Sequence, residues 1–408
     1  MRSAGSRRVS SMVEVAVARA NVLTARWAAT VGDAHTTALS GAGVWPLLAY
    51  LAGAAEGAGR DELVAAVGVE PGVAQEAATG LLRLLRAEPG LRAAVGLWAG
   101  PQVPLRDEWL RTLPAAAVGV LAGDALDVWV REQTGGLLDG ISAPVGPEAL
   151  LVLATVLTVR TTWKEPFEEG MLAADTGPWA RQAFHALSRS GPDLDQLAVY
   201  DTAHGPISVL SVEGDDGIVV DLVLGRPEAP AGAVLAAGIT VPGDSAPARL
   251  GSRLTDDDAA PGVTMGANQR YDGPRLFTDV PRFTVRGGHD LLATAELFGL
   301  RAVTDDSRGW FPGISDLPLA VTTARQELTA AFTALGFEAA AVTDVRMAGG
   351  SAPAARTRNV SFTIDRPFGF VARHRPSGLV LVAGWVAELE KFALPRHRMV
   401  DITAGVRP

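Results

Sequence analysis

The side chains able to do acid–base, nucleophilic or metal chemistry are scattered along this chain of 408 residues. Its six histidines show no metal-ligand spacing such as His-x-x-x-His, and neither a G-x-S-x-G elbow nor a phosphate-cradling G-x-x-x-x-G-K-[ST] loop occurs. The run Asp256-Asp257-Asp258 lacks the alternating spacing of a calcium loop and fits a solvated loop. Cysteine is absent, which excludes disulfides and thiolate sites and leaves the compartment open. We therefore expect no catalytic residue, no metal and no cofactor.

The stretch 336–347 indicates a conformational rather than a catalytic role. From position 337 onward its odd positions are uncharged, and every charge lies at an even position, in Glu338, Asp344 and Arg346. Successive side chains of a strand face opposite sides, so one face would be buried while the other stays in solvent. Three consecutive alanines also fit a helix. The stretch predicts either a strand without fixed partners or a short helix.

Composition describes a chain that folds around a large core. Hydrophobic residues make up 48% and charged residues 20%, and the mean hydropathy is +0.19. The formal net charge of −9 argues against nucleic acid or an anionic membrane as the main partner. No segment approaches the ~18–20 apolar residues needed to cross a bilayer. We expect a monomer.

Helices are predicted early in the chain and strands late. Helical spacing occurs over 13–31, 44–55, 60–68, 73–86 and 105–113, and strand patterns occur over 91–98, 150–159 and 197–224. The apolar run 150–159 is typical of a strand covered on both faces. This order favours an α+β fold over repeated βαβ units. We divide the chain into a loose leader (1–12), one domain (13–389) and a tail (390–408).

Ordered motifs give the chain a resemblance to a known family. Gly336-Phe337-Glu338-Ala339-Ala340-Ala341-Val342-Thr343 resembles the hinge that opens the reactive loop of the serpins. Residues 127–136 resemble the helix that lies across the serpin main sheet, and residues 151–167 resemble the central strand and the segment leaving it. Residues 279–300, 361–370 and 379–389 resemble late strands and a helix of the family. The resemblance covers roughly residues 20 to 389.

The resemblance implies an α+β serpin-like fold: a large mixed main sheet, two smaller sheets, about eight or nine helices, and an exposed reactive loop at about 336–358. It implies a serine-type endopeptidase inhibitor of bacterial type that acts as a suicide substrate. A serine protease cleaves the loop, whose N-terminal part then inserts into the main sheet. The inserting residues would face inward at Ala339, Ala341, Thr343, Val345 and Met347, where no charge occurs.

Several positions depart from the family pattern. Phe337 stands where inhibitory members carry a small residue, and its ring would slow the start of insertion. Ala334 replaces an acidic residue, so a salt bridge at the top of the sheet would be missing. Gln326 and Thr155 replace a histidine and an asparagine near the sheet-opening point, which also includes Trp163. These changes lie in one region and are consistent with a polar cluster rebuilt as a set.

The scissile bond has two candidate positions. Counting from the hinge places it at Gly350-Ser351, and the nearby Met347, Ala348 and Ala352 would suit elastase- or subtilisin-like enzymes. Counting back from residues 366–368 places it near residues 353–356, where Arg356 would suit a trypsin-like enzyme. Arg356 and Arg358 also fit a solvated loop end. We predict Gly350-Ser351 and keep Arg356-Thr357 as the alternative.

Two other functional classes stay open. The chain could be a non-inhibitory serpin-like carrier or binding protein, which would gain no heat stability after loop cleavage. It could also be an enzyme on an unrelated mixed fold, although no constellation of residues supports one. The basic N-terminus lacks a clean apolar stretch before a cleavage site. We therefore expect a cytoplasmic protein, with an extracellular location as the alternative because many serpins are secreted.

Overall fold

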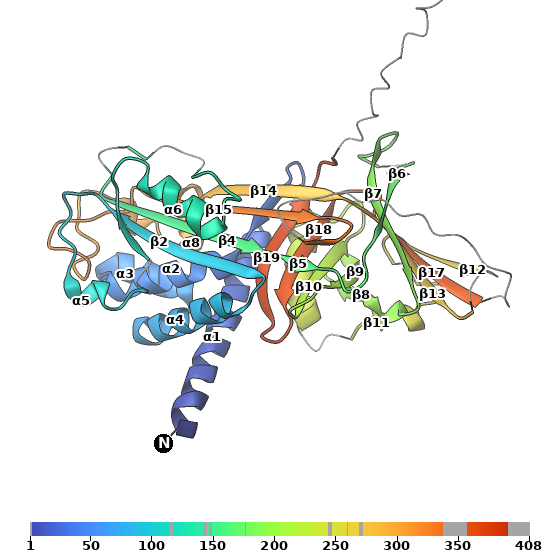
Figure 1. Cartoon of the computed structure of the whole chain (residues 1–408), viewed down its shortest axis with the longest axis horizontal. Coiled ribbons are helices and arrows are strands. Elements are labelled where there is room, and N and C mark those ends of the chain that lie inside the picture. Colours follow the sequence, from blue (N-terminus) through green and yellow to red (C-terminus); the bar gives the residue numbers. More distant parts are fainter. Residues whose placement is uncertain are drawn as a thin grey trace, which may run out of the picture.

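The computed structural model describes residues 2–114, 117–141, 145–146, 149–175, 177–243, 247–258, 260–268, 272–337 and 357–390. Three sheets and eight α-helices form this described part of the chain. We call the sheets the main sheet, the second sheet and the end sheet. Figure 1 shows the helices α2, α3 and α4 under one half of the molecule and the end sheet at the opposite end.

The main sheet holds the candidate site. Its strands run in the order β3-β2-β4-β15-β16-β5, and β14 pairs with β15. Their bounds are β2 Leu91–Ala99, β3 Val118–Val120, β4 Leu151–Val159, β5 Thr161–Thr162, β14 Phe283–Asp290, β15 Thr323–Phe332 and β16 Gly336–Phe337. The pairs β2–β4 and β14–β15 are antiparallel, whereas β4 and β15 are parallel. The sheet is therefore mixed, as predicted.

Both faces of β4 are covered. Leu151, Leu153 and Leu157 join the large core, while Val152 and Val156 pack with Trp98 and Trp129 in a second cluster. This agrees with the unbroken apolar run of the strand. The second cluster lies under α6 (Ala125–Thr134), which packs on β2 and β4. A helix thus crosses the main sheet where the resemblance implied one.

Helices α2 (Gly41–Ala54), α3 (Gly57–Val67) and α4 (Pro71–Ala87) pack on one another, and α2 also contacts β2, β4 and β19. Helix α2 begins where the Ser40 hydroxyl accepts a hydrogen bond from the Gly43 N–H, which satisfies one of the free donors of the first turn. All its residues except Gly53 are buried, so it forms the apolar centre of the helical layer.

The second sheet has the order β1-β19-β18-β10-β9-β8-β11. Its strands are β1 Thr37–Leu39, β8 Leu197–Thr202, β9 Gly205–Glu213, β10 Ile218–Leu224, β11 Arg249–Leu250, β18 Phe368–His374 and β19 Leu379–Val386. Helix α7 (Ala231–Thr240) packs on β18 and contacts α1 (Arg2–Ala28). The three predicted short strands of residues 197–224 are β8, β9 and β10.

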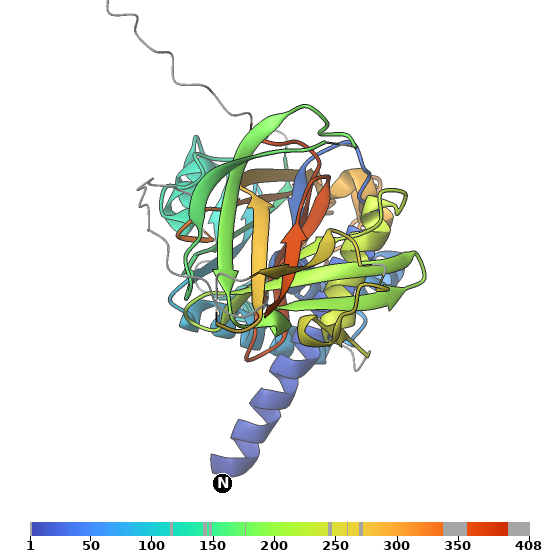
Figure 2. The same ribbon diagram turned by 90° about the vertical axis from the view of Figure 1, so that its right-hand side faces the viewer.

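The end sheet has the order β12-β17-β13-β7-β6. Its strands are β6 Glu168–Ala173, β7 Ala183–Gly191, β12 Val263–Asn268, β13 Arg275–Pro281 and β17 Thr357–Thr363. Figure 2 views the molecule from the end where this sheet lies. Because β16 and β17 are strands, both ends of the predicted loop 336–358 lie in sheets, and the connection between them is residues 338–356.

Three expectations differ from the structure. The helix predicted over 105–113 is only α5, Asp107–Leu110, and the late helix is short as well, with α8 spanning Ala295–Phe298. The second sheet has seven strands and so is no smaller than the main one. Helix α1 begins at Arg2 rather than at residue 13, and its first turns extend away from the molecule in both views (Figures 1 and 2). The division into leader, domain and tail stays a prediction.

Candidate functional site

The main sheet is split at one end by β16. Over residues 323–328 of β15 and 152–157 of β4 the two strands pair directly. Farther along, β16 lies between β15 and β5, with Phe337 opposite Phe332 on one side and opposite Thr161 on the other. Since β5 follows β4 after one residue, Gly336 and Phe337 occupy the place of a strand inserted between β4 and β15.

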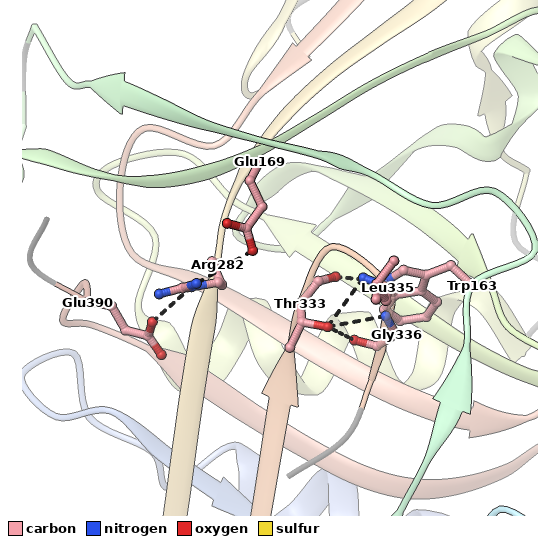
Figure 3. Close-up of polar contacts among 7 residues, drawn as sticks. All are labelled: Trp163, Glu169, Arg282, Thr333, Leu335, Gly336 and Glu390. Atoms are coloured by element: carbon pink, nitrogen blue, oxygen red, sulfur yellow. Dashed lines mark hydrogen bonds and ion pairs between the residues drawn. The ribbon is translucent and has the colours of Figure 1, made fainter. Parts of the chain in front are cut away.

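A tight turn of residues 333–336 reverses the chain between β15 and β16. The Thr333 N–H donates to the Gly336 carbonyl at 2.9 Å. The Thr333 hydroxyl donates to the same carbonyl at 3.0 Å and accepts from the N–H groups of Leu335 and Gly336 at 3.3 and 3.2 Å (Figure 3). One side chain therefore satisfies the backbone of the whole turn, as threonine does in such turns.

Two aromatic residues after β5 fasten this turn from outside. The Trp163 indole N–H donates to the Thr333 carbonyl at 2.9 Å, and the Trp163 backbone N–H donates to the Leu335 carbonyl at 2.9 Å (Figure 3). The Phe167 N–H donates to the Ala334 carbonyl at 2.9 Å. Three carbonyl groups of the turn thus accept hydrogen bonds from this segment, one from the Trp163 side chain and two from backbone N–H groups.

Phe337 lies inside the main sheet. Its side chain is fully buried, and its ring centroid lies 6.0 Å from that of Phe370 in β18. The neighbouring Phe332 ring stacks on Phe283 at 5.5 Å. Gly336 is needed for this approach, because a Cβ there would lie 2.3 Å from the Thr161 carbonyl oxygen.

A buried polar cluster lies where β4 and β15 pair. Thr155 and Gln326 are opposite each other in the register, and the Gln326 amide donates to the Thr155 hydroxyl at 3.4 Å. The same amide donates to the Ser40 carbonyl at 2.8 Å, and its oxygen accepts from the Ser40 N–H at 2.9 Å. The Ser40 hydroxyl donates to the Leu381 carbonyl at 2.5 Å. This cluster ties the two strands to the start of α2 and to β19.

An ion-pair cluster lies at the split end of the sheet, although Ala334 carries no charge. Arg282, just before β14, contacts Glu169 of β6 at 3.6 Å and Glu390 at 3.2 Å (Figure 3). All three side chains are at least two-thirds buried. Although Ala334 can form no ion pair, Arg282 forms two at this end of the sheet. They link the start of β14 to β6 of the end sheet and to Glu390.

Lys164 connects the turn region to the second sheet. Its N–H donates to the Glu213 carbonyl at 3.0 Å, and its ammonium group donates to the Glu213 carboxylate at 2.8 Å. This hydrogen bond, with help from Arg375, holds the pKa of Glu213 below its ordinary value. The segment after β5 is thus hydrogen-bonded to the 333–336 turn on one side and to β9 of the second sheet on the other.

The structure places only part of the predicted site. Thr155, Trp163, Gln326, Ala334, Gly336 and Phe337 all lie in or beside the main sheet, in two groups at and below the split. The remaining hinge residues (Glu338, Ala339, Ala340, Ala341, Val342, Thr343, Val345, Met347) and Gly350, Ser351 and Arg356 are outside the described residues. Thr357 begins β17, and Arg358 is exposed on it.

Sequence reasoning did not single out Thr333, Phe370 or the Arg282 cluster. Thr333 could have been recognised from the sequence. A threonine whose hydroxyl accepts hydrogen bonds from the N–H groups two and three residues later, here Leu335 and Gly336, is typical of turns. Phe370 and Glu390 are distant in the chain, and local patterns could not have paired them with the hinge.

No group of three histidine, aspartate or glutamate side chains in the described ranges is placed to hold a metal ion. Among the same residues, no helix is both long and apolar enough to span a bilayer.

Comparisons with known proteins agree with this geometry. Residues 260–389 match the family model described as "Serpin (serine protease inhibitor)". Glia-derived nexin of Rattus norvegicus is 25% identical over 270 residues, which are 65% of this chain and 62% of the nexin. The chain thus spans less than two-thirds of that relative's length.

The fold is that of thyroxine-binding globulin. A structure of the human protein complexed with thyroxine aligns with a TM-score of 0.67 at 15% identity, over 94% of this chain and 100% of the other. A second structure of a thyroxine-binding globulin complex gives 0.68 at 18% identity, over 93% and 100%. At such identities these two structures bear on the fold alone. The family match, the nexin relative, the shared fold and a main sheet split at the start of the hinge lead to one conclusion: this chain resembles the serpins in sequence over residues 260–389 and in fold over nearly its whole length.

Proposed function

We propose that this protein inhibits a serine protease as a suicide substrate. The protease cleaves the connection 338–356 and forms an acyl-enzyme with the new carboxyl end. The N-terminal part of the cut segment then extends β16 between β4 and β15, as in serpin reactive-loop insertion, an established case of strand addition. The attached protease is carried along the sheet, and its ester is not hydrolysed.

The observation that supports this proposal most strongly is the place of β16. Residues 336–337 pair with β15 and β5, at the place where an inserted strand would begin. The direct pairing of β4 with β15 below them closes the rest of the sheet. A longer strand would grow from an existing start rather than nucleate a new one.

The side-chain pattern suits such growth. Phe337 is buried, and alternation along a strand would place Ala339, Ala341, Thr343 and the following odd residues on the same inward face. None of them is charged. At roughly 0.5–1.5 kcal/mol per hydrogen bond, a fully inserted strand would release on the order of ten kcal/mol.

The step that insertion must overcome is the separation of β4 from β15. Six residue pairs between these strands would have to part, together with the contact of Gln326 with Thr155. The amide of Gln326 would keep its two hydrogen bonds to Ser40 if it stayed with β15 and α2. The β4–β15 ladder and this one contact therefore oppose the separation, and the hydrogen bonds of the inserted strand would compensate for their loss.

A carrier or binding function is the second candidate. It is favoured by one observation: two structures that share the fold are thyroxine-binding globulins in complex with thyroxine. The two candidates differ in what loop cleavage does. An inhibitor gains heat stability when the cut strand inserts, and a member that has lost insertion gains none.

The test is a denaturing gel after mixing the protein with subtilisin-, elastase-, trypsin- and chymotrypsin-like proteases. We expect a covalent band at the summed mass with at least one of them. Mass spectrometry of the released fragment would then identify the bond, with Ser351 as the expected first residue and Thr357 as the alternative.

Thermal unfolding of the cleaved protein completes the test. Covalent complex together with a higher unfolding temperature supports inhibition. Cleavage in 338–356 with neither a complex nor a stability gain would overturn it and favour the carrier function. Catalytically dead protease, in which the nucleophile is replaced, is the control that must give no band.

A further inference from the structure

Strand β17 is paired along both of its edges. Residues 275–279 of β13 pair with it in parallel at one edge, and residues 263–268 of β12 pair with it antiparallel at the other. The β12 ladder covers Thr357 to Phe362, nearly the whole strand. Figure 1 shows β12, β17 and β13 together at the end of the molecule.

The two ends of the connection 338–356 are therefore fixed in different sheets. Nineteen residues join Phe337 in the main sheet to Thr357 in the end sheet. If β16 continued in the register of Phe337 opposite Phe332, Arg346 would lie opposite Thr323 at the far end of β15. Nine of the nineteen residues would then be used by the inserted strand.

The remaining ten residues leave almost no chain beyond the return along the inserted strand. An extended chain spans at most about 3.3–3.6 Å per residue, so residues 347–356 reach roughly 35 Å. The inserted strand itself would run about 30 Å along β15. The return to the level of Phe337 would use nearly all of this reach, and only about one or two residues would be left to cross from the main sheet to Thr357 in the end sheet. Full insertion without cleavage therefore requires β17 to leave the end sheet.

We propose that β12 is a clamp that holds β17 in place and thereby makes strand growth at β16 depend on cleavage. This inference rests on the proposed function, because it concerns the insertion step of that mechanism. Without β12, β17 would be an edge strand held by β13 alone, and edge strands are the ones that separate or pair elsewhere. With β12 in place, two ladders must break before an uncut chain can insert.

The ladder offers a matched pair of variants. The Thr363 N–H donates to the Gly262 carbonyl at 2.9 Å, and hydrogen-bonded pairs alternate in an antiparallel ladder. The N–H of Gly266 therefore points toward β17, and that of Ala267 points away. A Cβ at Gly266 meets no atom within 4 Å, and Ala267 is exposed, so neither site is crowded. Gly266→Pro removes a clamp hydrogen bond, and Ala267→Pro is the control.

The experiment incubates the uncut proteins below their unfolding temperature. Conversion is followed by loss of cleavage in 338–356 by a non-target protease and by a rise in unfolding temperature, with mass spectrometry showing that the chain is whole. Gly266→Pro is expected to convert at least tenfold faster than the wild-type protein and Ala267→Pro. Where cleavage of the wild-type protein raises its stability, equal conversion rates together with faster hydrogen exchange of β17 amides in Gly266→Pro would overturn the clamp.

A cross-link provides the rescue. Ala267 lies opposite Arg358 in a non-hydrogen-bonded pair, and the chain contains no cysteine that could interfere. Adding Ala267→Cys and Arg358→Cys to the Gly266→Pro variant should return conversion to the wild-type rate when oxidised, and reduction should restore the fast rate. Fast conversion with the disulfide formed would contradict the proposal.

Cleaved wild-type protein separates this inference from the proposed function. A stability gain after cleavage shows that the sheet accepts a strand, so slow conversion of uncut Gly266→Pro would then count against the clamp only. No gain after cleavage overturns the proposed function. Exchange of the β17 amides then decides alone: faster exchange in Gly266→Pro than in Ala267→Pro supports the clamp, and equal exchange overturns it.

Discussion

Phe337 is the residue that fixes the start of the inserted strand. Its fully buried ring packs near Phe370, so Phe337→Ala would leave a cavity that the surrounding strands fill only in part. We expect the intact protein to lose about 3–5 kcal/mol of unfolding free energy. Urea unfolding followed by tryptophan fluorescence measures it.

Leu335 provides the comparison for Phe337. It lies two residues away, and its side chain is 48% exposed, so Leu335→Ala should change stability by less than about 0.5 kcal/mol. Similar losses in both variants would mean that the stability of this segment does not come from the buried ring.

Thr343 tests which face of the cut segment turns inward. Thr343→Arg would place a charge on the buried face, at a cost of several kcal/mol, and slow insertion until deacylation wins. The protein should then be cleaved at the same bond as before but form no stable complex. A denaturing gel with the target protease separates cleaved from complexed protein.

The matched substitution is Val342→Arg, one residue along the same segment, where alternation turns the side chain outward. It should leave complex formation intact. If Val342→Arg abolishes the complex while Thr343→Arg preserves it, the assignment of the inward face is reversed.

At the scale of elements, the Gln326 cluster governs how tightly β4 and β15 are closed. Gln326→Leu removes both hydrogen bonds to Ser40 and leaves the buried Ser40 N–H without a partner, whereas the Ser40 carbonyl still accepts from the Val44 N–H. An unsatisfied buried group costs about 1–3 kcal/mol, so the uncut protein should be less stable to heat. Differential scanning calorimetry of the uncut protein measures the change.

Thr155→Val is the control for this cluster, because it removes only the 3.4 Å contact. Its loss should be well below that of Gln326→Leu. Equal losses would show that the pairing of Gln326 with Thr155, rather than with Ser40, holds the strands.

The sequence predicted the elements whose pattern is local and strong. The apolar run of β4, the three strands of 197–224 and helices α2 to α4 match the expected ranges within a few residues. The helix over 105–113 was overestimated, since only Asp107–Leu110 is helical and Arg106 and Leu105 instead bond to the 314–315 segment. Tertiary pairing overrode a local helical pattern there.

The site was harder to predict because its parts are far apart in sequence. The hinge motif identified residues 336–337, but burial of Phe337 depends on Phe370 and on Thr161, which no local pattern links to it. No strand was predicted over β12, because Gly266 and the polar residues around it weaken the strand pattern. Pairing with β17 stabilises β12 as a strand although its local sequence pattern is weak.

At the scale of the whole molecule, a buried histidine should make stability depend on pH. His289 of β14 contacts the Ala38 carbonyl at 2.7 Å, and its ring lies 4.9 Å from that of Trp27. Burial lowers the pKa of His289, partly offset by the Ala38 carbonyl and Glu327. The folded state thus favours neutral imidazole.

The sign of the effect follows from that direction. The stability from neutral His289 is fully present above the unfolded-state pKa of about 6.5, and it is lost as pH falls below this toward the lowered folded-state pKa. The protein should therefore unfold at a lower temperature at pH 5.5 than at pH 7.5. The difference should shrink in His289→Gln, and an unchanged difference in that variant would assign the pH dependence to other groups.

The order of strands in the second sheet has a consequence for synthesis. Strands β18 and β19, the last to be made, lie between β10 and β1, so the sheet has a gap at its centre until the chain is nearly complete. At ~5–20 residues per second, a ribosome needs roughly ten to thirty seconds between β10 and β19. During that interval the apolar edge of β10 lacks its neighbour, which makes the nascent chain a natural client for chaperones.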